Sequence, residues 1–505
     1  MEPELEPELE LETSARDSVA CDAVPCCATA CDGTAAEGEG SFRRVHFIGI
    51  GGAGMSGIAL VLHQRGYTVT GSDLKASRYT RPLVREGIDI SIGHSAATID
   101  RVAPEIVVIS SAIPETNPEL VRARELGIEV WHRARMLSYL SRGSVTILCA
   151  GTHGKTTTSS LVATMLERLG QSPTFLIGGV IDGYETNGNS GEGPYFVAEA
   201  DESDASFLYL DPNYVIVTNI EADHLDHYGT LENIEKTFCQ LMASIPDDGC
   251  LVVCGESPHV VELARSCGKR VVTYGFGPEN DVRCEVERGT GVNSFYVTLP
   301  DGTRHHLHLD HNPGDHNCLN ASAALALADV LGLPAAEAAE ALSGFMGVHR
   351  RFEFVGEAAG VRVVDDYGHH PTEIAATLKA AAGQGFGHIR VVFQPHRYSR
   401  TQALAEEFGP AFAAADEVVV MDVFSAGETP IPGVTGRALA KSIAKKVPSA
   451  KVRYMSNRHD IVDQLVADAL PGDIVMTMGA GDVTMLGPAI VEALRAKEAA
   501  AGEAR

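Results

Sequence analysis

The chain has 505 residues, which is more than one hydrophobic core usually supports, so the length predicts about three domains. Glycine is abundant, at 51 residues, and aromatic residues make up only 6%, a balance typical of turn-rich α/β proteins. A formal net charge of −27 argues against nucleic acid and anionic membranes as partners, so any anion must bind at a local site that outweighs this charge.

The first 42 residues are predicted to form a disordered, acidic, Cys-containing tail. They begin MEPELEPELELE and show no periodicity of a sheet or a packed helix. Four cysteines (Cys21, Cys26, Cys27 and Cys31) could form a metal or redox cluster, but their spacing has no C-x-x-C pair and no histidine lies among them. The acidic start differs from a signal peptide, and no run of about 18 apolar residues follows, so we expect a cytoplasmic protein.

Residues 43–143 are predicted to form a first α/β domain that is Rossmann-like. A short apolar strand, Val45–Ile50, leads into the loop Gly49-x-Gly51-x-x-Gly54 and then a helix, and Asp73 ends the next strand. This is the context of a dinucleotide-binding loop, in which a helix N-terminus holds a diphosphate and an acidic residue lies near a ribose. A nucleoside-diphosphate sugar would fit equally well.

Residues 144–345 are predicted to form a central domain of the P-loop ATPase type. The strand Val145–Ala150 is followed by GTHGKTTT and a helix that begins at Lys155, so several backbone N–H groups surround one point. Lys155 can reach the β- and γ-phosphates of ATP, and the Thr156 hydroxyl can bind Mg²⁺. The general loop pattern requires glycine at position 149, where this chain has Cys149.

Carboxylates and histidines follow the next two strands of this domain. Glu199, Asp201 and Glu202 lie at the end of Tyr195–Asp201, where a Mg²⁺–phosphate site needs hard oxygen ligands. His224 lies in EADHLDHYG, after the strand Tyr214–Ile220, and could bind a second metal ion. An antiparallel patch is expected around residues 282–309, followed by a long helix over His316–Leu333.

Residues 346–495 are predicted to form a third domain, again Rossmann-like, with two basic clusters. The segment GVHRRFE contains Arg351, and FQPHRYSRT contains His396, Arg397 and Arg400. Guanidinium groups bind phosphate and carboxylate oxygens in a bidentate manner. Between these clusters, DDYGHHPTE places two aspartates and two histidines before Pro371; an N-cap at the helix start explains only part of this pattern.

Ten segments in order resemble the Mur ligase family, over roughly residues 45–487. They are HFIGIGGAGMSGIA, SSAIPETNPE, GTHGKTTT, EADESDASFL, NIEADHLDHYG, HNCLNA, GVHRRFE, DDYGHHPTEI, FQPHRYSRT and MGAGDV. The family's phosphate loop is shorter than the general pattern, which accounts for Cys149. Within the family, GGAGMSG and FQPHRYSRT favour the member that adds L-alanine to UDP-N-acetylmuramate over the one that recycles murein tripeptide.

The resemblance implies three α/β domains that bind a UDP-sugar, ATP and an amino acid, with Mg²⁺ as a cofactor and no nucleic-acid or membrane partner. It assigns to ATP the residues Gly151, Thr152, His153, Gly154, Lys155, Thr156, Thr157, Asn317, Asn320, Arg351 and Asp366. It assigns to substrate binding Gly49, Gly51, Gly52, Gly54, Asp73, Ser110, Ser111 and Arg400, with Arg400 coming from the third domain to close over the reacting groups. It assigns to Mg²⁺ Thr156, Glu199 and His224, and to catalysis Lys155, His369, His396 and Arg397.

Two other functions stay open on the residues alone. A nicotinamide-dependent dehydrogenase could use the loop Gly49–Gly54, but it leaves GTHGKTTT unexplained. A nucleotide-gated binding protein could use its third domain to recognise a partner. Neither the oligomeric state nor the selectivity among alanine, serine and glycine is readable from the chain.

Overall fold

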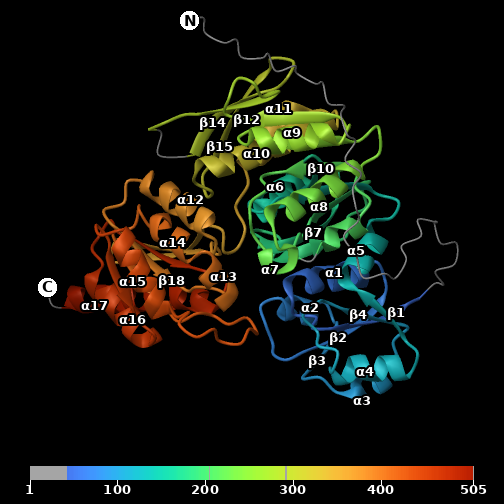
Figure 1. Ribbon diagram of the computed structural model, residues 1–505, viewed down its shortest axis with the longest axis horizontal. Helices are drawn as coiled ribbons and strands as arrows, with labels where there is room; N and C mark the ends of the chain where they lie inside the picture. The colour runs from blue at the N-terminus through green and yellow to red at the C-terminus, as the bar shows by residue number, and fades with distance from the viewer. Residues whose placement is uncertain (1–41, 204, 290–292, 504–505) are drawn as a thin grey trace, which may run out of the picture. The chain divides into compact units, whose positions relative to one another are not determined.

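The structure is a computed structural model that describes residues 42–203, 205–289 and 293–503. Apart from Phe42, the tail predicted for residues 1–42 lies outside the described residues. Phe42 itself is buried, with its ring 5.3 Å from that of Trp131. Three sheets follow one another along the chain, and Figure 1 shows their domains in the order of its colour bar.

The first domain is a parallel five-stranded sheet in the order β3-β2-β1-β4-β5. This is the strand order of a Rossmann-like fold: β1 to β3 extend the sheet on one side and β4 and β5 on the other, so the topological switch point lies between β1 and β4. Its strands are β1 (Arg44–Ile48), β2 (Thr68–Asp73), β3 (Asp89–Ile92), β4 (Ile106–Ile109) and β5 (Glu129–His132). Its helices are α1 (Ala53–Gln64), α2 (Thr80–Arg85), α3 (Ala96–Val102), α4 (Pro118–Glu125) and α5 (Arg133–Ser141).

The middle domain has a ten-stranded sheet in the order β15-β14-β13-β12-β11-β10-β6-β9-β7-β8. Its strands are β6 (Val145–Ala150), β7 (Thr174–Ile181), β8 (Thr186–Asn189), β9 (Tyr195–Glu199), β10 (Tyr214–Val217), β11 (Cys250–Cys254), β12 (Val271–Gly275), β13 (Val282–Val286), β14 (Asn293–Thr298) and β15 (Arg304–Leu309). Its helices are α6 (Lys155–Arg168), η1 (Ser206–Tyr209), α7 (Leu225–Tyr228), α8 (Leu231–Ala243), α9 (Pro258–Ser266), α10 (Asp315–Val330) and α11 (Ala335–Ser343). The predicted antiparallel patch is confirmed, since β14 pairs antiparallel with both β13 and β15.

The third domain has a six-stranded sheet in the order β16-β17-β21-β18-β19-β20, parallel except for β16. Its strands are β16 (Glu353–Ala358), β17 (Val361–Asp366), β18 (Ile389–Phe393), β19 (Glu417–Val420), β20 (Lys451–Tyr454) and β21 (Ile474–Met478). Its helices are α12 (Pro371–Ala382), α13 (Tyr398–Ala403), α14 (Ala405–Ala411), α15 (Gly436–Lys446), α16 (Arg458–Asp468), η2 (Asp482–Met485) and α17 (Leu486–Glu503).

The central strands of the second and third sheets are rich in apolar residues because they are buried on both faces. Every residue of β11, β18 and β21 is buried, as expected for strands with helices on both faces of their sheet. Among the described residues, no helix combines the length and apolar character that crossing a bilayer requires. The three-domain α/β fold predicted from the sequence is confirmed.

The sheets also determine where polar residues meet. In the middle domain β6 lies between β9 and β10, so the segments that follow these three parallel strands emerge side by side. In the third domain the same holds for β17, β21 and β18. Ligands of open α/β sheets bind at this carboxyl edge of the strands.

Candidate active site

The phosphate loop between β6 and α6 depends on two glycines. Gly151 has φ +139° and Gly154 has φ +83°, both in regions that favour glycine. A Cβ at Gly151 would lie 2.1 Å from Thr218 Oγ1, so the backbones of the loop and of the segment after β10 approach closely. Asn219 holds the loop from the same side, accepting a hydrogen bond from His153 N at 2.9 Å and donating one to His153 O at 3.0 Å.

Lys155 begins α6, and its side chain folds back over the loop. Its Nζ donates to Gly151 O at 2.6 Å and Thr152 O at 2.9 Å, and it forms an ion pair with Glu202 Oε1 at 2.8 Å. Burial lowers the pKa of Lys155, but the facing Glu202 and Glu199 outweigh it and raise that pKa, so the amine stays charged. Burial raises the pKa of Glu202 to about 7, and the other oxygen of its carboxylate, Oε2, is buried without a hydrogen-bond partner among the described residues.

The three predicted metal ligands lie close to this lysine. Thr156 Oγ1 donates to Glu199 Oε1 at 3.0 Å, and the second Glu199 oxygen accepts Gly178 N at 2.7 Å. His224 lies in a left-handed conformation, φ +51°, and its Nε2 is 3.9 Å from Glu202 Oε1. The hydroxyl of Thr156, the carboxylate of Glu199 and the imidazole of His224 form a donor set that fits Mg²⁺. Glu202 Oε2, which has no hydrogen-bond partner among the described residues, adds a second carboxylate oxygen beside them.

Asn317 and Asn320 are both buried one turn apart on α10, as the helix prediction required. Asn320 Nδ2 donates to Asn317 Oδ1 at 3.2 Å, and Asn317 Nδ2 donates to Pro313 O at 2.9 Å. They line a cavity of about 190 Å³, which we call the asparagine cavity. Its other lining residues include His153, Gly154, Glu221, Tyr274, Arg351, Asp366 and Glu373.

The first-domain glycine loop lies at the switch point of its sheet, after β1. Asp73, at the end of β2, accepts Gly51 N at 2.8 Å, so its carboxylate supports the loop backbone. Ser110 and Ser111 follow β4, the neighbour of β1, and Ser111 Oγ lies 3.1 Å from His132 Nε2. The loop and the two serines therefore lie at the carboxyl ends of neighbouring strands, and their roles in binding a sugar nucleotide stay predictions.

The third domain contributes the predicted histidines and arginines to a second cavity, of about 390 Å³, which we call the lysine cavity. It is lined from the middle domain by Lys155, Thr156, Glu199, Glu202 and His224, and from the third domain by Arg351, His369, His396, Arg397 and Arg400. The rings of His369 and His396 are 5.7 Å apart, and Arg400 pairs with Asp223 of the middle domain at 3.1 Å. Burial lowers the pKa of His369 to about 3 and that of His396 to about 4, so both are neutral at pH 7.

Asp366, which is assigned to ATP, has both of its oxygens hydrogen-bonded within its own domain. It ends β17, accepts hydrogen bonds from Phe352 N and Gly368 N, and lines the asparagine cavity. Burial raises its pKa to about 6. The adjacent Asp365 binds Arg350 at 2.9 Å, so this aspartate and arginine form a buried ion pair within the domain.

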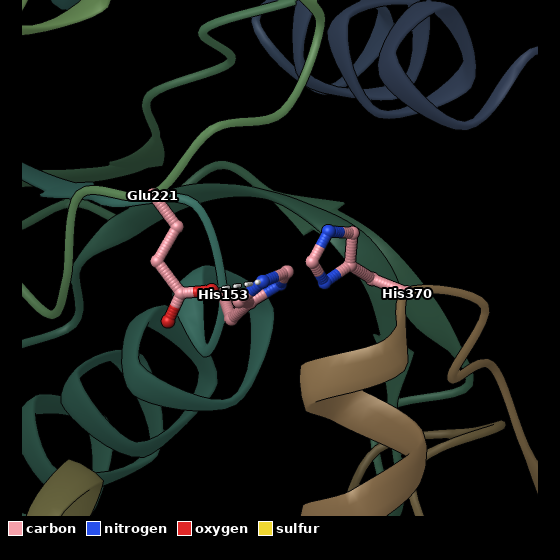
Figure 2. Close-up of side chains that lie close together, drawn as sticks. All are labelled: His153, Glu221 and His370. Atoms are coloured by element: carbon pink, nitrogen blue, oxygen red, sulfur yellow. Dashed lines mark ion pairs between the residues drawn. The ribbon is translucent and has the colours of Figure 1, made fainter. Parts of the chain in front are cut away.

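The predicted N-cap before Pro371 is present and has an unexpected partner. His370 caps α12 through Thr372 N, and Glu373 completes a capping box by accepting His369 N and His370 N. His370 also approaches the phosphate loop, with its ring 4.7 Å from that of His153. Among the described residues, His153, Glu221 and His370 offer possible ligand atoms within 4.8 Å of one another (Figure 2).

Sequence reasoning missed several residues that line the lysine cavity. Arg78 and Tyr79 reach it from the first domain, so all three domains contribute to its wall. No local motif marks these two residues. Glu373 lines both cavities and was also missed, although its place three residues after the N-cap is the signal of a capping box.

Comparison with known proteins matches three family models to successive parts of the chain. They are "Mur ligase family, catalytic domain" over residues 44–144, "Mur ligase middle domain" over 149–328 and "Mur ligase, glutamate ligase domain" over 350–481. A relative from Geotalea daltonii, named UDP-N-acetylmuramate–L-alanine ligase, is 45% identical, covering 90% of this chain and 99% of its own.

Two solved structures share the whole three-domain arrangement. A UDP-N-acetylmuramate–alanine ligase from Thermotoga maritima has a TM-score of 0.76 and 32% identity, covering 90% of this chain and 99% of that one. A murein peptide ligase from Psychrobacter arcticus has a TM-score of 0.68 and 25% identity over the same shares. The models, the sequence relative and the structures agree: the chain belongs to the Mur ligase family.

Proposed function

We propose that the protein is an ATP-dependent ligase that joins L-alanine to the carboxylate of UDP-N-acetylmuramate. The products are UDP-N-acetylmuramoyl-L-alanine, ADP and phosphate, in peptidoglycan precursor synthesis. The observation that carries the proposal is the lysine cavity, where a phosphate loop, a metal-ligand set and an Arg/His-rich wall face one another from three domains. We infer that residues 43–143, 144–345 and 346–495 bind mainly the UDP-sugar, ATP and the amino acid, in that order.

The chemistry requires an activated carboxylate, because oxide is too poor a leaving group for direct amide formation. Transfer of the γ-phosphoryl group of ATP to a carboxylate oxygen gives an acyl phosphate and ADP. The amine then attacks the acyl carbon, phosphate leaves with that oxygen, and the amine loses a proton. Two anions must meet in the first step, so positive charge from Lys155, Arg351 and Arg397 would offset their repulsion.

Mg²⁺ would be held by Thr156, Glu199 and His224, and when bound it neutralises charge on the phosphate oxygens. Burial, opposed by Asp223, lowers the pKa of His224, which leaves its imidazole neutral as a metal ligand must be. Gly151 and Gly154 allow the loop N–H groups to face a phosphate, and Asn317 and Asn320 provide amide groups for a base in the asparagine cavity.

In the lysine cavity, the side chains of His369 and His396 are candidate acceptors for the amine proton. His369 and His396 are neutral and can accept a hydrogen bond, but a pKa of about 3 or 4 holds a proton poorly at pH 7. We therefore propose that they orient the amine in the lysine cavity while closure of the domains excludes water from the acyl phosphate. Their catalytic role and the cytoplasmic location stay predictions.

The choice of amine distinguishes this function from the tripeptide-recycling activity. The relative from Geotalea daltonii carries the alanine-adding name at 45% identity, whereas the murein peptide ligase is 25% identical. The decisive assay measures ADP release with UDP-N-acetylmuramate and either L-alanine or the tripeptide as amine. ADP release that requires both the sugar nucleotide and L-alanine supports the proposal. ADP release with the tripeptide but not with L-alanine, or with no amine at all, contradicts it.

A further inference from the structure

Glu373, at the start of α12, has contacts that its role as a helix cap does not explain. Its Oε2 accepts His369 N at 3.0 Å and His370 N at 3.2 Å, which completes the capping box. Its other oxygen, Oε1, faces out of the helix: it lies 3.3 Å from His153 Nδ1 in the phosphate loop and 3.8 Å from Arg351 Nη1. One carboxylate thus fixes the HHP turn (residues 369–371) and also faces His153 and Arg351, two residues predicted to bind ATP.

His153 lies between two carboxylates that come from different domains. Its Nδ1 faces Glu373, and its Nε2 is 3.5 Å from Glu221 Oε2 in the middle domain. Thr372 of α12 donates to that same Glu221 oxygen at 3.0 Å, so α12 contacts the loop region at two neighbouring points. Burial lowers the pKa of His153, but the two carboxylates outweigh this effect and raise it to about 9.

This arrangement favours a proton over a metal ion as the positive charge that joins these groups. His370 Nδ1 accepts Thr372 N, so in a neutral ring the other nitrogen, Nε2, carries the hydrogen and has no lone pair for a metal. An imidazolium at His153 has none either. Figure 2 shows the His153–Glu221 pair beside His370, whose ring packs against that of His153 at an interplanar angle of 39°.

The position of this contact gives it a consequence for binding. His153, Arg351 and Glu373 line both the asparagine cavity and the lysine cavity, so they form the wall that the two cavities share. A nucleotide with its base near Asn317 and its last phosphate near Lys155 has to pass along this wall. The Glu373 side chain is only 13% exposed. Burial raises its pKa, but His369, His153 and Arg351 outweigh burial and hold that pKa well below its usual range.

We propose that Glu373 is a positioning residue that docks the HHP turn onto the phosphate loop and holds His153 and Arg351, as cations, beside the phosphate chain of ATP. The inference rests on the proposed function, because it deepens the account of the nucleotide site. Charged and titratable groups from each packed element face this contact. They are Glu221 from the segment after β10, Arg351 from the segment before β16, and the imidazoles of His369 and His370 from the turn itself.

The test measures binding of a non-hydrolysable ATP analogue with Mg²⁺ to the full-length protein. Glu373→Gln keeps the size of the side chain and removes its charge, and we expect the Kd to rise about tenfold, as is common when one of two contacting charged residues is neutralised. His153→Gln should weaken binding similarly, and the double variant should be no weaker than either single one. Additive losses would mean that Glu373 acts only as a helix cap, which overturns the proposal. An unchanged or tighter Kd in Glu373→Gln would overturn it too, since Glu373 would then be idle or a competitor of phosphate.

The matched control is Glu353→Gln in the same domain. Glu353 also pairs with a histidine, His349 at 2.8 Å, and also accepts a backbone N–H, from Arg350, but it does not line either cavity. This variant should bind the analogue like the parent protein. An equal loss in Glu353→Gln would show that any broken His–Glu pair in this domain weakens binding, which contradicts a specific role for Glu373.

A second measurement does not depend on ATP. Histidine ¹³C-NMR of the full chain, with the His153 signal assigned from its loss in His153→Gln, follows the titration of the imidazole. We expect its midpoint to fall by at least one pH unit in Glu373→Gln and to stay in place in Glu353→Gln. An unmoved midpoint would refute the contact itself. If the parent protein fails to bind the analogue, the proposed function fails, and this titration alone decides the inference.

Discussion

Gly151→Ala is expected to disable the phosphate loop by steric overlap. Alanine at φ +139° costs about 1–3 kcal/mol in backbone strain. The new Cβ would lie 2.1 Å from Thr218 Oγ1 and 3.0 Å from Asn219 O, and relieving such overlap in a packed site costs about 1–3 kcal/mol more. The sum of roughly 2–6 kcal/mol is large beside a typical unfolding free energy of about 5–15 kcal/mol.

The assay combines thermal unfolding with titration of an ATP analogue. We expect the melting temperature of Gly151→Ala to fall by roughly 5–15 °C and analogue binding to be lost, because the loop can relax only by moving its N–H groups. Gly170→Ala is the control: it also has positive φ, +70°, but nothing lies within 4 Å of its Cβ position, so it should lose about 1 kcal/mol and bind normally. Adding Thr218→Ala to Gly151→Ala should restore part of the stability. Parental stability and affinity in Gly151→Ala would refute the reasoning.

Four further outcomes are expected. Lys155→Ala should abolish ligation, because Lys155 is the lysine that reaches the loop and its loss leaves Glu202 buried without its cation; near-parental turnover would disprove the site assignment. With ¹⁸O in the muramyl carboxylate, mass spectrometry of the released phosphate should find the label, and unlabelled phosphate would exclude an acyl phosphate. Deletion of residues 1–40 should leave most of the specific activity, as judged by ADP release. The His153 pKa is raised from 6.5 to about 9, so its stabilisation is fully present below pH 6.5 and is lost as pH rises through 9; the difference in melting temperature between the parent and His153→Gln should shrink over this range, and a constant difference would contradict it.

The fold was predictable because its strands carry their own signal. Val145–Ala150 is a mostly apolar run followed by a glycine, and strand β6 has those bounds. Val361–Asp366 has three valines before its two aspartates, and strand β17 has those bounds. Short, more exposed strands escaped notice: β3 (Asp89–Ile92) and β20 (Lys451–Tyr454) each have no fully buried residue, so nothing in their composition separates them from loops.

The candidate site was predictable where one segment contains a complete motif. GTHGKTTT specifies strand, turn, lysine and hydroxyl together, and the structure assembles them as expected. Arg78 and Tyr79 could not be found this way, since they reach the lysine cavity only through the packing of distant segments. Glu202 shows the same limit: its proximity to the EAD motif was visible, but its ion pair with Lys155 depends on the order of β6 and β9 in the sheet.

The pairing of cations with carboxylates explains how so acidic a chain can bind a triphosphate. Lys155 faces Glu202, and Arg400 faces Asp223. An incoming phosphate chain has to compete with these carboxylates for the same cations, so it gains less from each contact than from an unpaired cation. Binding therefore requires additional positive charge that the carboxylates can share. Mg²⁺ arriving with ATP would supply it, held beside Glu199 and the oxygen of Glu202 that has no hydrogen-bond partner among the described residues. The acidic residues that weaken binding of a bare phosphate chain are the same ones that would favour its magnesium complex.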